Sequence, residues 1–407
     1  MADMENLILP QTYILGDGEK SMKIEKMTID NINGIKHLDL NFNEGLNLIC
    51  GENGVGKTTV LKAIAYQFLY GQDSFIKKHY GAENGCVKLC LNTGEYIGYI
   101  VTDFVPGYIN RYDGDYERGN NVIYFSSSRF INYEKIDALH TFKNINIDNS
   151  NTHSSQLLVS GVDNNIKNWF INQYIFSKVE YSLDKYQQNN LDLSINVFNL
   201  LDKNLTVFTV KSDYEIMLKN KENEIYFEML SDGYKSCIYI LLGIIKEIEY
   251  RFPDINAVEF DNIIMIDEID MHLHPQWQAK LVKVLKETFP KAQIIATTHS
   301  PSVLQNAKAE EIIPLYKDEN GDVHIKELHL GEYGLQGWTL EEIMKDVMGM
   351  ESTTSDLYAK IMHEFDQAMK EDNVKVAKEK YELLNKMWHP NNVLRQLLKI
   401  QMAGMEE

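Results

Sequence analysis

Hydrophobic and polar residues alternate with a period of two near the start of the chain, which is typical of half-buried β-strands. The alternation runs through 23–31 and 37–42, with the turn formers Asn33 and Gly34 between the two segments. We therefore predict a two-stranded start to the folded chain. Residues 1–22 show no such pattern and are predicted to form an N-terminal leader.

A short apolar strand at 46–50 leads directly into a glycine-rich loop, GENGVGKT at 51–58, which matches the phosphate-binding P-loop pattern. Apolar residues at helical spacing follow between Val60 and Phe68. This strand–loop–helix context is the one that a P-loop requires. It disfavours the alternative, a glycine-rich turn that binds nothing.

The residue types of this loop suit a nucleotide triphosphate. Its glycines leave backbone N–H groups open to phosphate oxygens, and the helix that follows presents its positive end to them. Lys57 adds a charge that can reach the β- and γ-phosphates, and Thr58 offers a hydroxyl to Mg²⁺. The residues predicted to bind ATP are Asn53, Gly54, Val55, Gly56, Lys57, Thr58 and Thr59.

Two apolar strands in the second half of the chain each end in candidate catalytic residues. The first, at 263–266, is followed by Asp267 and Glu268, and the second, at 293–297, is followed by Thr298 and His299. Asp267 is predicted to hold Mg²⁺ through water, and Glu268 to act as general base for the attacking water. His299 suits a sensor of the γ-phosphate. The alternatives are solvated carboxylates after a core strand and a histidine with a purely structural role.

The run LSDGYKS at 230–236 comes shortly before the first of these strands. Ser231 and Gly233 are placed at the start of a predicted helix, where a hydroxyl and an open backbone N–H can meet an anion. Within one chain no anion is evident for them. Across a two-fold interface they would complete the γ-phosphate site of the partner subunit.

The rest of the chain carries none of these motifs. Residues 130–228 lack sustained heptads and are predicted to form a compact inserted subdomain, and 338–407 is predicted to be a helical region with three amphipathic helices. The helical region is predicted to dock a partner or stabilise oligomers, and the alternative is that it only covers the edge of the head's own sheet. The docking residues expected are Leu357, Ile361, Phe365, Leu383 and Trp388.

The amino-acid composition and net charge limit the classes of protein to which the chain can belong. The chain of 407 residues is 44% hydrophobic and 24% charged, which is typical of a globular protein, and we expect a cytoplasmic location because neither a signal peptide nor a membrane-spanning stretch is evident. The formal net charge of −19 argues against an extended basic surface for nucleic acid. An H-x-H pair, His272 and His274, lacks further metal ligands in the sequence nearby and is expected to have an interface or packing role.

Together the motifs at 51–58, 230–236, 263–268 and 297–300 resemble those of ATP-binding-cassette (ABC) ATPases, especially the soluble heads related to SMC, Rad50 and RecF. The resemblance implies an α/β fold: a P-loop ATPase head over 23–337, with a mixed sheet flanked by helices. It also implies that ATP and Mg²⁺ are bound between two heads.

Four further positions take roles only through this resemblance. Asp270 occupies the place of the residue that links the two sites, and the unusual signature residues Asp232 and Tyr234 leave the rate of hydrolysis open. Gln72 is a candidate for the glutamine that contacts Mg²⁺, and Arg129 for a sensor of nucleotide or of the insert.

The acidic strand continues as DEIDMHLHP at 267–275, which resembles prokaryotic defence ATPases. The short insert and helical tail look most like the ATPase of Septu-type antiphage systems, also found beside retrons. That family implies a homodimer or a higher even-numbered oligomer, and a separate HNH nuclease (PtuB-like) through which nucleic acid is reached. The alternatives are a DNA-clamping head like RecF, which would bind duplex directly, and a transporter ATPase.

Overall fold

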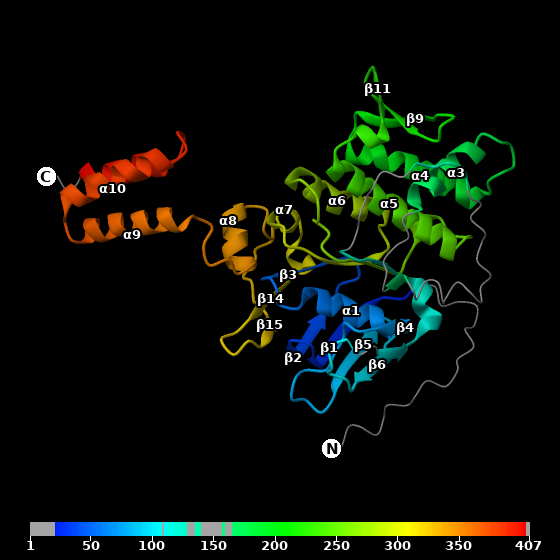
Figure 1. Ribbon diagram of the computed structural model, residues 1–407, viewed down its shortest axis with the longest axis horizontal. Coiled ribbons are helices and arrows are strands. Elements are labelled where there is room, and N and C mark those ends of the chain that lie inside the picture. Colours follow the sequence, from blue (N-terminus) through cyan, green and yellow to red (C-terminus); the bar gives the residue numbers. More distant parts are fainter. Residues whose placement is uncertain (1–20, 108–109, 128–134, 140–156, 159–164, 404–407) are drawn as a thin grey trace. The chain divides into compact units, whose positions relative to one another are not determined.

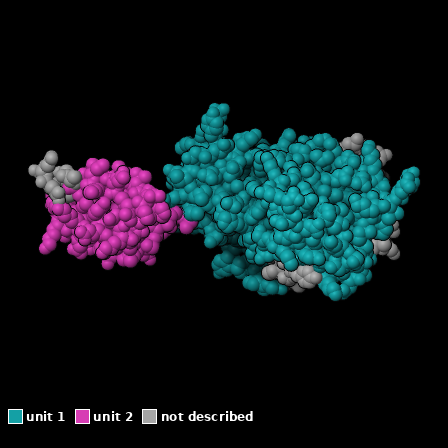
Figure 2. Space-filling view, turned by 90° about the horizontal axis from the view of Figure 1, so that it is seen from above, with its two compact units in different colours: residues 1–349 teal, residues 350–407 magenta. Residues whose placement is uncertain are grey.

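The computed structural model describes residues 21–107, 110–127, 135–139, 157–158 and 165–403. It divides the chain into two compact units, 1–349 and 350–407 (Figure 2). Most of the predicted leader and Arg129 lie outside the described residues.

The centre of the first unit is a six-stranded mixed sheet, in the order β15-β14-β3-β13-β12-β8 (Figure 1). The strands from β14 to β8 are parallel, and β15 at one edge is antiparallel. Its strands are β3 (Leu46–Gly51), β8 (Val122–Phe125), β12 (Ile263–Ile266), β13 (Gln293–Thr297), β14 (Ile312–Lys317) and β15 (Val323–Ile325). This sheet and its flanking helices confirm the predicted α/β class.

Side chains of the central strands alternate between two hydrophobic cores. On β12, Ile264 and Ile266 enter the core on one face, whereas Ile263 and Met265 enter the core on the other. Because both faces are covered, the strand is a continuous apolar run, as expected for a buried parallel strand. This explains why periodicity of two is visible at the chain's start and absent here.

One core lies between the central sheet and a four-stranded antiparallel sheet, with α1 (Lys57–Gln67) packed into it. The Tyr99 hydroxyl donates to the Ala63 carbonyl at 3.0 Å and joins that sheet to α1. The antiparallel sheet has the order β2-β1-β5-β6, and its strands are β1 (Ile24–Ile32), β2 (Ile35–Asn41), β5 (Gly85–Leu91) and β6 (Tyr96–Val101).

The other core lies under a helical layer, drawn in green in Figure 1. The layer consists of α3 (Ile166–Phe176), α4 (Lys185–Leu201), α5 (Asp232–Arg251) and α6 (Pro275–Thr288). A small antiparallel sheet adjoins it, formed by β9 (Leu205–Val210), β10 (Ile216–Asn220) and β11 (Asn223–Tyr226). Residues of the predicted insert, such as Phe170 and Phe198, therefore share one core with α5 of the head.

Shorter elements connect these layers. They are β4 (Tyr70–Asp73) paired with β7 (Asn110–Asp113), α7 (Pro301–Leu304), and the 3₁₀ turns η1 (Tyr116–Asn121), η2 (Phe227–Met229), η3 (Ala257–Glu259) and η4 (Ala309–Glu311). Among the described residues, no helix has both the length and the apolar composition that crossing a membrane requires.

The segment that ends the first unit comprises α8 (Leu340–Glu342) and one π-helical turn, η5 (Ile343–Val347). Ile343 and Val347 are buried in the core of the helical layer. The first twelve residues of the predicted region 338–407 thus belong to the first unit.

The second unit is a three-helix cluster with its own core. Its helices are α9 (Asp356–Lys370), α10 (Val374–Met387) and α11 (Leu394–Ala403). Ile361, Phe365 and Trp388 were predicted to dock a partner, but they are buried in this core because they form the shared face of the helices. Leu357 and Leu383 are exposed.

Candidate functional site

The P-loop joins the end of β3 to the start of α1 through glycines that no other residue could replace without strain. Gly51 has φ 135°, and a Cβ there would lie 2.0 Å from the Leu315 carbonyl oxygen. Gly56, with φ 111°, occupies the N-cap of α1 in the left-handed region. Each position needs the conformational freedom of glycine. The loop therefore brings its backbone N–H groups to the helix N-terminus, where anions are favoured.

Lys57 reaches back across this loop. Its Nζ donates to the carbonyls of Gly51 at 2.9 Å and Glu52 at 2.7 Å. Burial lowers the pKa of the Lys57 ammonium to about 8, and the nearby carboxylates of Glu268 and Asp267 offset only part of that effect. A strongly charged anion beside Lys57 would restore its preference for the protonated form.

Asp267 gathers hydroxyl groups from two other elements. Thr58 Oγ1 lies 3.1 Å from Oδ1 of Asp267, and Thr297 Oγ1 donates to the same oxygen at 2.7 Å. Asp267 is only 1% exposed. A hydroxyl and a carboxylate converging at the start of α1 are hard oxygen ligands, which fit Mg²⁺. Thr58 and Asp267 are the residues that would hold it.

Glu268 follows Asp267 in a strained backbone conformation, with φ 50°. Its backbone N–H donates to Thr297 Oγ1 at 2.7 Å, so the same hydroxyl orders both acidic residues. The Glu268 residue is half-buried. A residue other than glycine costs free energy when its backbone is left-handed, and such strained residues are concentrated at functional sites.

His299 is joined to the loop after β12 through Asp270. The Asp270 carboxylate accepts from the His299 backbone N–H at 3.1 Å and from the Thr298 hydroxyl at 2.6 Å. Burial, and then the charge of Lys57, lower the pKa of the His299 imidazole. His299 is consequently neutral at pH 7, with one ring N–H to donate and one ring nitrogen to accept. Asp270 thus has a role within one chain that sequence reasoning did not find.

The signature residues belong to a different place, the N-terminus of α5 in the helical layer. Ser231 is the exposed N-cap and accepts from the Tyr234 backbone N–H at 3.4 Å. A Cβ on Gly233 would lie 3.1 Å from Cδ1 of Trp277, so the chain passes close to the start of α6. Across the part of the chain that the structure describes, no hydrogen bond joins Ser231 or Gly233 to the P-loop.

The remaining candidates are less informative. His272 is exposed with φ 62°, and His274 caps α6 by accepting from the Gln276 backbone N–H at 3.4 Å. Gln72 lies on β4.

The sequence did not reveal the role of Thr297, whose hydroxyl donates to Asp267 and accepts from the Glu268 backbone N–H. The available signal was its position at the end of β13, level with Asp267 on the neighbouring strand. A second missed contact is at Gly349, where a Cβ would lie 2.3 Å from Oε1 of Glu52. The end of the first unit therefore lies against the P-loop.

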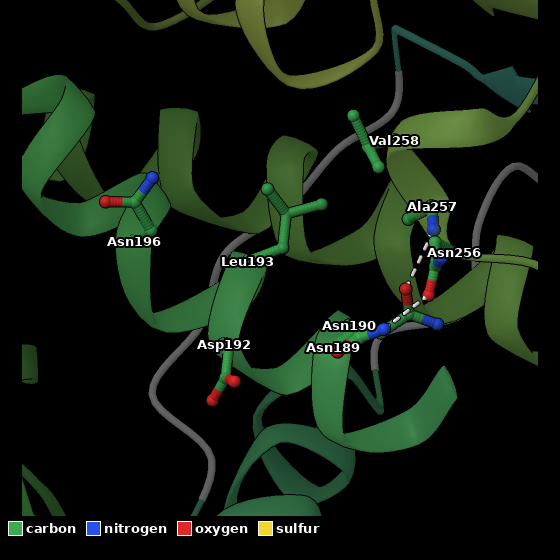
Figure 3. Close-up of a pocket in the computed structure, with 8 residues that line it drawn as sticks. All are labelled: Asn189, Asn190, Asp192, Leu193, Asn196, Asn256, Ala257 and Val258. Carbon is green, nitrogen blue, oxygen red and sulfur yellow. Dashed lines mark hydrogen bonds between the residues drawn. The ribbon is translucent and has the colours of Figure 1, made fainter. Parts of the chain in front are cut away.

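A cavity of about 380 Å³ between α4 and η3 offers a contrast (Figure 3). Its amide groups largely bond to one another and to the backbone: Asn189 donates to Asn256, and Asn190 accepts from the Ala257 backbone N–H. Among the described residues that line it there is no lysine, arginine or histidine. It therefore lacks the cations that a triphosphate requires.

The fold and the cluster at the ends of β3, β12 and β13 define a P-loop ATPase head of the α/β class. Two family models match the chain: "AAA ATPase domain" over residues 22–95 and "AAA domain, putative AbiEii toxin, Type IV TA system" over residues 110–305. The chain is similar to the Septu protein PtuA of Bacillus thuringiensis, with 41% identity over 93% of this chain and 98% of that protein. It belongs to the Septu PtuA family.

Two other similarities are more distant. The Retron Vc95 probable ATPase of Vibrio cholerae is 31% identical over 44% of this chain and 36% of that protein. The SMC head domain from Thermotoga maritima aligns with 15% identity and a TM-score of 0.41, over 76% of this chain and 100% of that one.

Proposed function

We propose that the protein is the ATP-hydrolysing regulatory subunit of an antiphage defence complex. Two copies close head-to-tail around ATP, and this closure controls a partner HNH nuclease. The observation that carries the proposal is the division of the site. The P-loop cluster is assembled within one chain, whereas the exposed N-cap Ser231 lies at the start of a different helix, α5, where its side chain accepts only from the Tyr234 backbone N–H among the described residues.

Each residue of the cluster then has a distinct task. Lys57 and the loop N–H groups bind the triphosphate, and Thr58 with Asp267 would hold Mg²⁺, which neutralises phosphate charge when bound. Glu268 accepts a proton from the attacking water, and its strained backbone fixes where its side chain starts. Neutral His299 donates its ring N–H toward the γ-phosphate.

The C-terminal unit is the proposed contact for the nuclease. Three exposed apolar residues, Val393 just before α11 and Leu397 and Ile400 on it, are spaced four and three residues apart, which is the spacing of one helix face. Exposed apolar surface beyond what a unit's own core needs is typical of protein interfaces. Membership of the Septu PtuA family supports a defence role.

The Glu268→Gln variant tests the closure. Removing the base should stop hydrolysis and accumulate the ATP-bound dimer, which light scattering behind a sizing column would detect. Lys57→Ala is the matched control and should stay monomeric with ATP. A Glu268→Gln protein that binds ATP and remains a monomer would contradict the shared pocket. Tight, salt-dependent binding of duplex DNA by the protein alone would instead favour a DNA clamp.

A further inference from the structure

A buried lysine outside the nucleotide cluster bridges three segments of the helical layer. Lys167 lies on α3, and its side chain is 1% exposed. Its Nζ donates to Glu228 Oε1 at 2.7 Å and to Glu215 Oε2 at 2.9 Å. Glu215 immediately precedes β10, and Glu228 lies in η2. A helix of the insert is thereby tied to the polypeptide that leads into α5.

Glu228 is three residues before Ser231, and it is held at both of its polar ends. Its carboxylate binds Lys167, and its backbone carbonyl accepts from Lys235 Nζ at 3.3 Å. Lys235 belongs to the first turn of α5 and also pairs with Asp232 at 3.0 Å. The start of the signature helix is thus connected to α3 through one glutamate.

Packing holds the two ends of the signature segment differently. Met229 is 72% exposed, and Ser231 and Asp232 are exposed as well. Phe227 is buried against Phe198 and Tyr239, but it precedes the segment. At the other end of the segment, Tyr234 is buried against Trp277, and its hydroxyl donates to the Phe198 carbonyl at 2.9 Å. Met229, Ser231 and Asp232 lack such burial, so the entry to α5 is held on its N-terminal side by the polar tether between Glu228 and Lys167.

The ion pairs of Lys167 with Glu228 and Glu215 are formed at neutral pH, because the lysine stays protonated there. Burial lowers the pKa of the lysine, but hydrogen bonds to Glu228 and Glu215 outweigh this effect and raise it. The two carboxylates are largely buried, with side chains 18% and 13% exposed. Without the lysine they would lose the cation that they share, and their mutual repulsion would push Glu228 away.

We propose that Lys167 is a positioning residue for the signature, and that it acts on the nucleotide pocket of the partner subunit rather than on its own. The proposal rests on the shared pocket proposed above. Lys167 holds the Glu228 carboxylate, and Glu228 fixes the polypeptide that enters α5. This in turn sets where Ser231 and Gly233 lie against the triphosphate of the partner subunit.

Lys167→Met should separate two properties that a general loss of structure would change together. ATP binding by the monomer should stay unchanged, because the P-loop cluster is elsewhere. ATP-driven dimerisation and kcat should each fall about tenfold or more. Lys167→Arg should restore both properties, since arginine can also bind two carboxylates. Glu215→Gln is the matched control, since the link between Lys167 and Glu228 remains.

Mixing the weakened Lys167→Met variant with an inactive P-loop variant provides the decisive experiment. The Lys167→Met subunit has a displaced signature but an intact P-loop. The Lys57→Ala subunit has an intact signature but a P-loop that cannot bind ATP. A mixed dimer then contains one intact pocket, so the equimolar mixture should recover about a quarter of the wild-type rate if subunits pair at random. A mixture of Lys57→Ala and Glu268→Gln should recover nothing, because both changes affect the P-loop side.

The reference mixture is Ser231→Arg with Lys57→Ala. If it recovers activity and the Lys167→Met mixture does not, the role of Lys167 is overturned while the shared pocket stands. If the reference mixture also stays inactive, the shared pocket itself fails. Should Lys167→Met prove unfolded by circular dichroism, Glu228→Gln takes its place, since it breaks the same link from the other side. Failure of a folded Glu228→Gln to complement overturns the proposal equally.

Discussion

The Thr297 hydroxyl donates to the Asp267 carboxylate at 2.7 Å and accepts the Glu268 backbone N–H at the same distance. A single side chain at the end of β13 therefore orders both acidic residues at the end of β12. Both contacts are made within the chain, so the protein itself fixes the Asp267 carboxylate and the Glu268 backbone.

Replacement of Thr297 by valine should disturb both contacts without changing the side chain's shape. Buried Asp267 would lose a donor and the Glu268 N–H an acceptor, at a cost of about 1–3 kcal/mol in unfolding free energy. Urea denaturation would measure this, and kcat should fall as well. Thr297→Ser keeps the hydroxyl and should remain near the parent on both measures. Equal losses in the two variants would show that the methyl group matters instead.

Affinity for ATP analogues should fall as pH rises through about 8. That is the pKa to which burial lowers the free Lys57 ammonium, whereas the bound triphosphate favours the charged form. Binding is then strongest below pH 8, and log Kd should rise by up to about one per pH unit above it. Isothermal calorimetry between pH 7 and 9.5 would measure the slope. Lys57→Arg stays charged throughout and should show no such step, although its overall affinity is lower.

Buried Glu249 should make the protein less stable as pH rises from about 4.5 to about 7. Burial raises the pKa of its carboxyl to about 7, even though Trp169 and Asn190 donate hydrogen bonds to it. In that interval the folded chain holds a proton that the unfolded chain has released. The contribution of Glu249 to the free energy of unfolding is fully present below the pKa of the unfolded chain. It is lost once the pH has risen through the pKa of the folded chain, a change of ~3 kcal/mol.

The Glu249→Gln variant isolates the pH-dependent contribution of Glu249 to the free energy of unfolding. Its side chain is neutral at every pH, so the difference in unfolding free energy between parent and variant should shift against the parent from pH 5 to pH 8. Chemical denaturation at both values would measure it. A constant difference would mean that Glu249 is ionised in the folded protein already at pH 5.

A truncation after Gly349 should remove partner binding and spare the ATPase. Cutting at Thr339, close to the boundary that the sequence predicts at 338, would also delete Ile343 and Val347 from the core of the first unit. The shorter deletion leaves both cores of the head intact and should keep ATP hydrolysis within about twofold. Co-purification with a co-expressed HNH nuclease, the proposed partner, would test the contact.

Ile400→Glu provides a finer version of the same test. The residue is 71% exposed, so a charge there should leave the second unit folded while opposing an apolar interface. Retention of the nuclease by both the truncated and the Ile400→Glu proteins would place its contact on the first unit.

The central strands and the P-loop could be predicted because their signals are local. The segment 46–58 contains an apolar strand, a glycine loop and a helical pattern in sequence, and the structure has β3, loop and α1 there. The convergence of Thr58, Asp267 and Thr297 follows from parallel strands ending at one edge, but the order of those strands is set by pairing across more than 200 residues.

Two helices were missed for identifiable reasons. α4 is rich in asparagine, which has low intrinsic helix propensity, so tertiary burial of Leu191 and Phe198 outweighs the local preference. Its capping box, Asp184 with Gln187, was the signal available. α11 follows the Pro390 break closely and carries its apolar residues partly on an exposed face. The Lys167 link could not be predicted, because three distant segments must first fold around it.

Gly349, the last residue of the ATPase head, rests against the Glu52 side chain of the P-loop. The polypeptide thus leaves the first unit beside the P-loop. A partner bound to the second unit would therefore be attached to the chain next to the loop that is proposed to bind ATP.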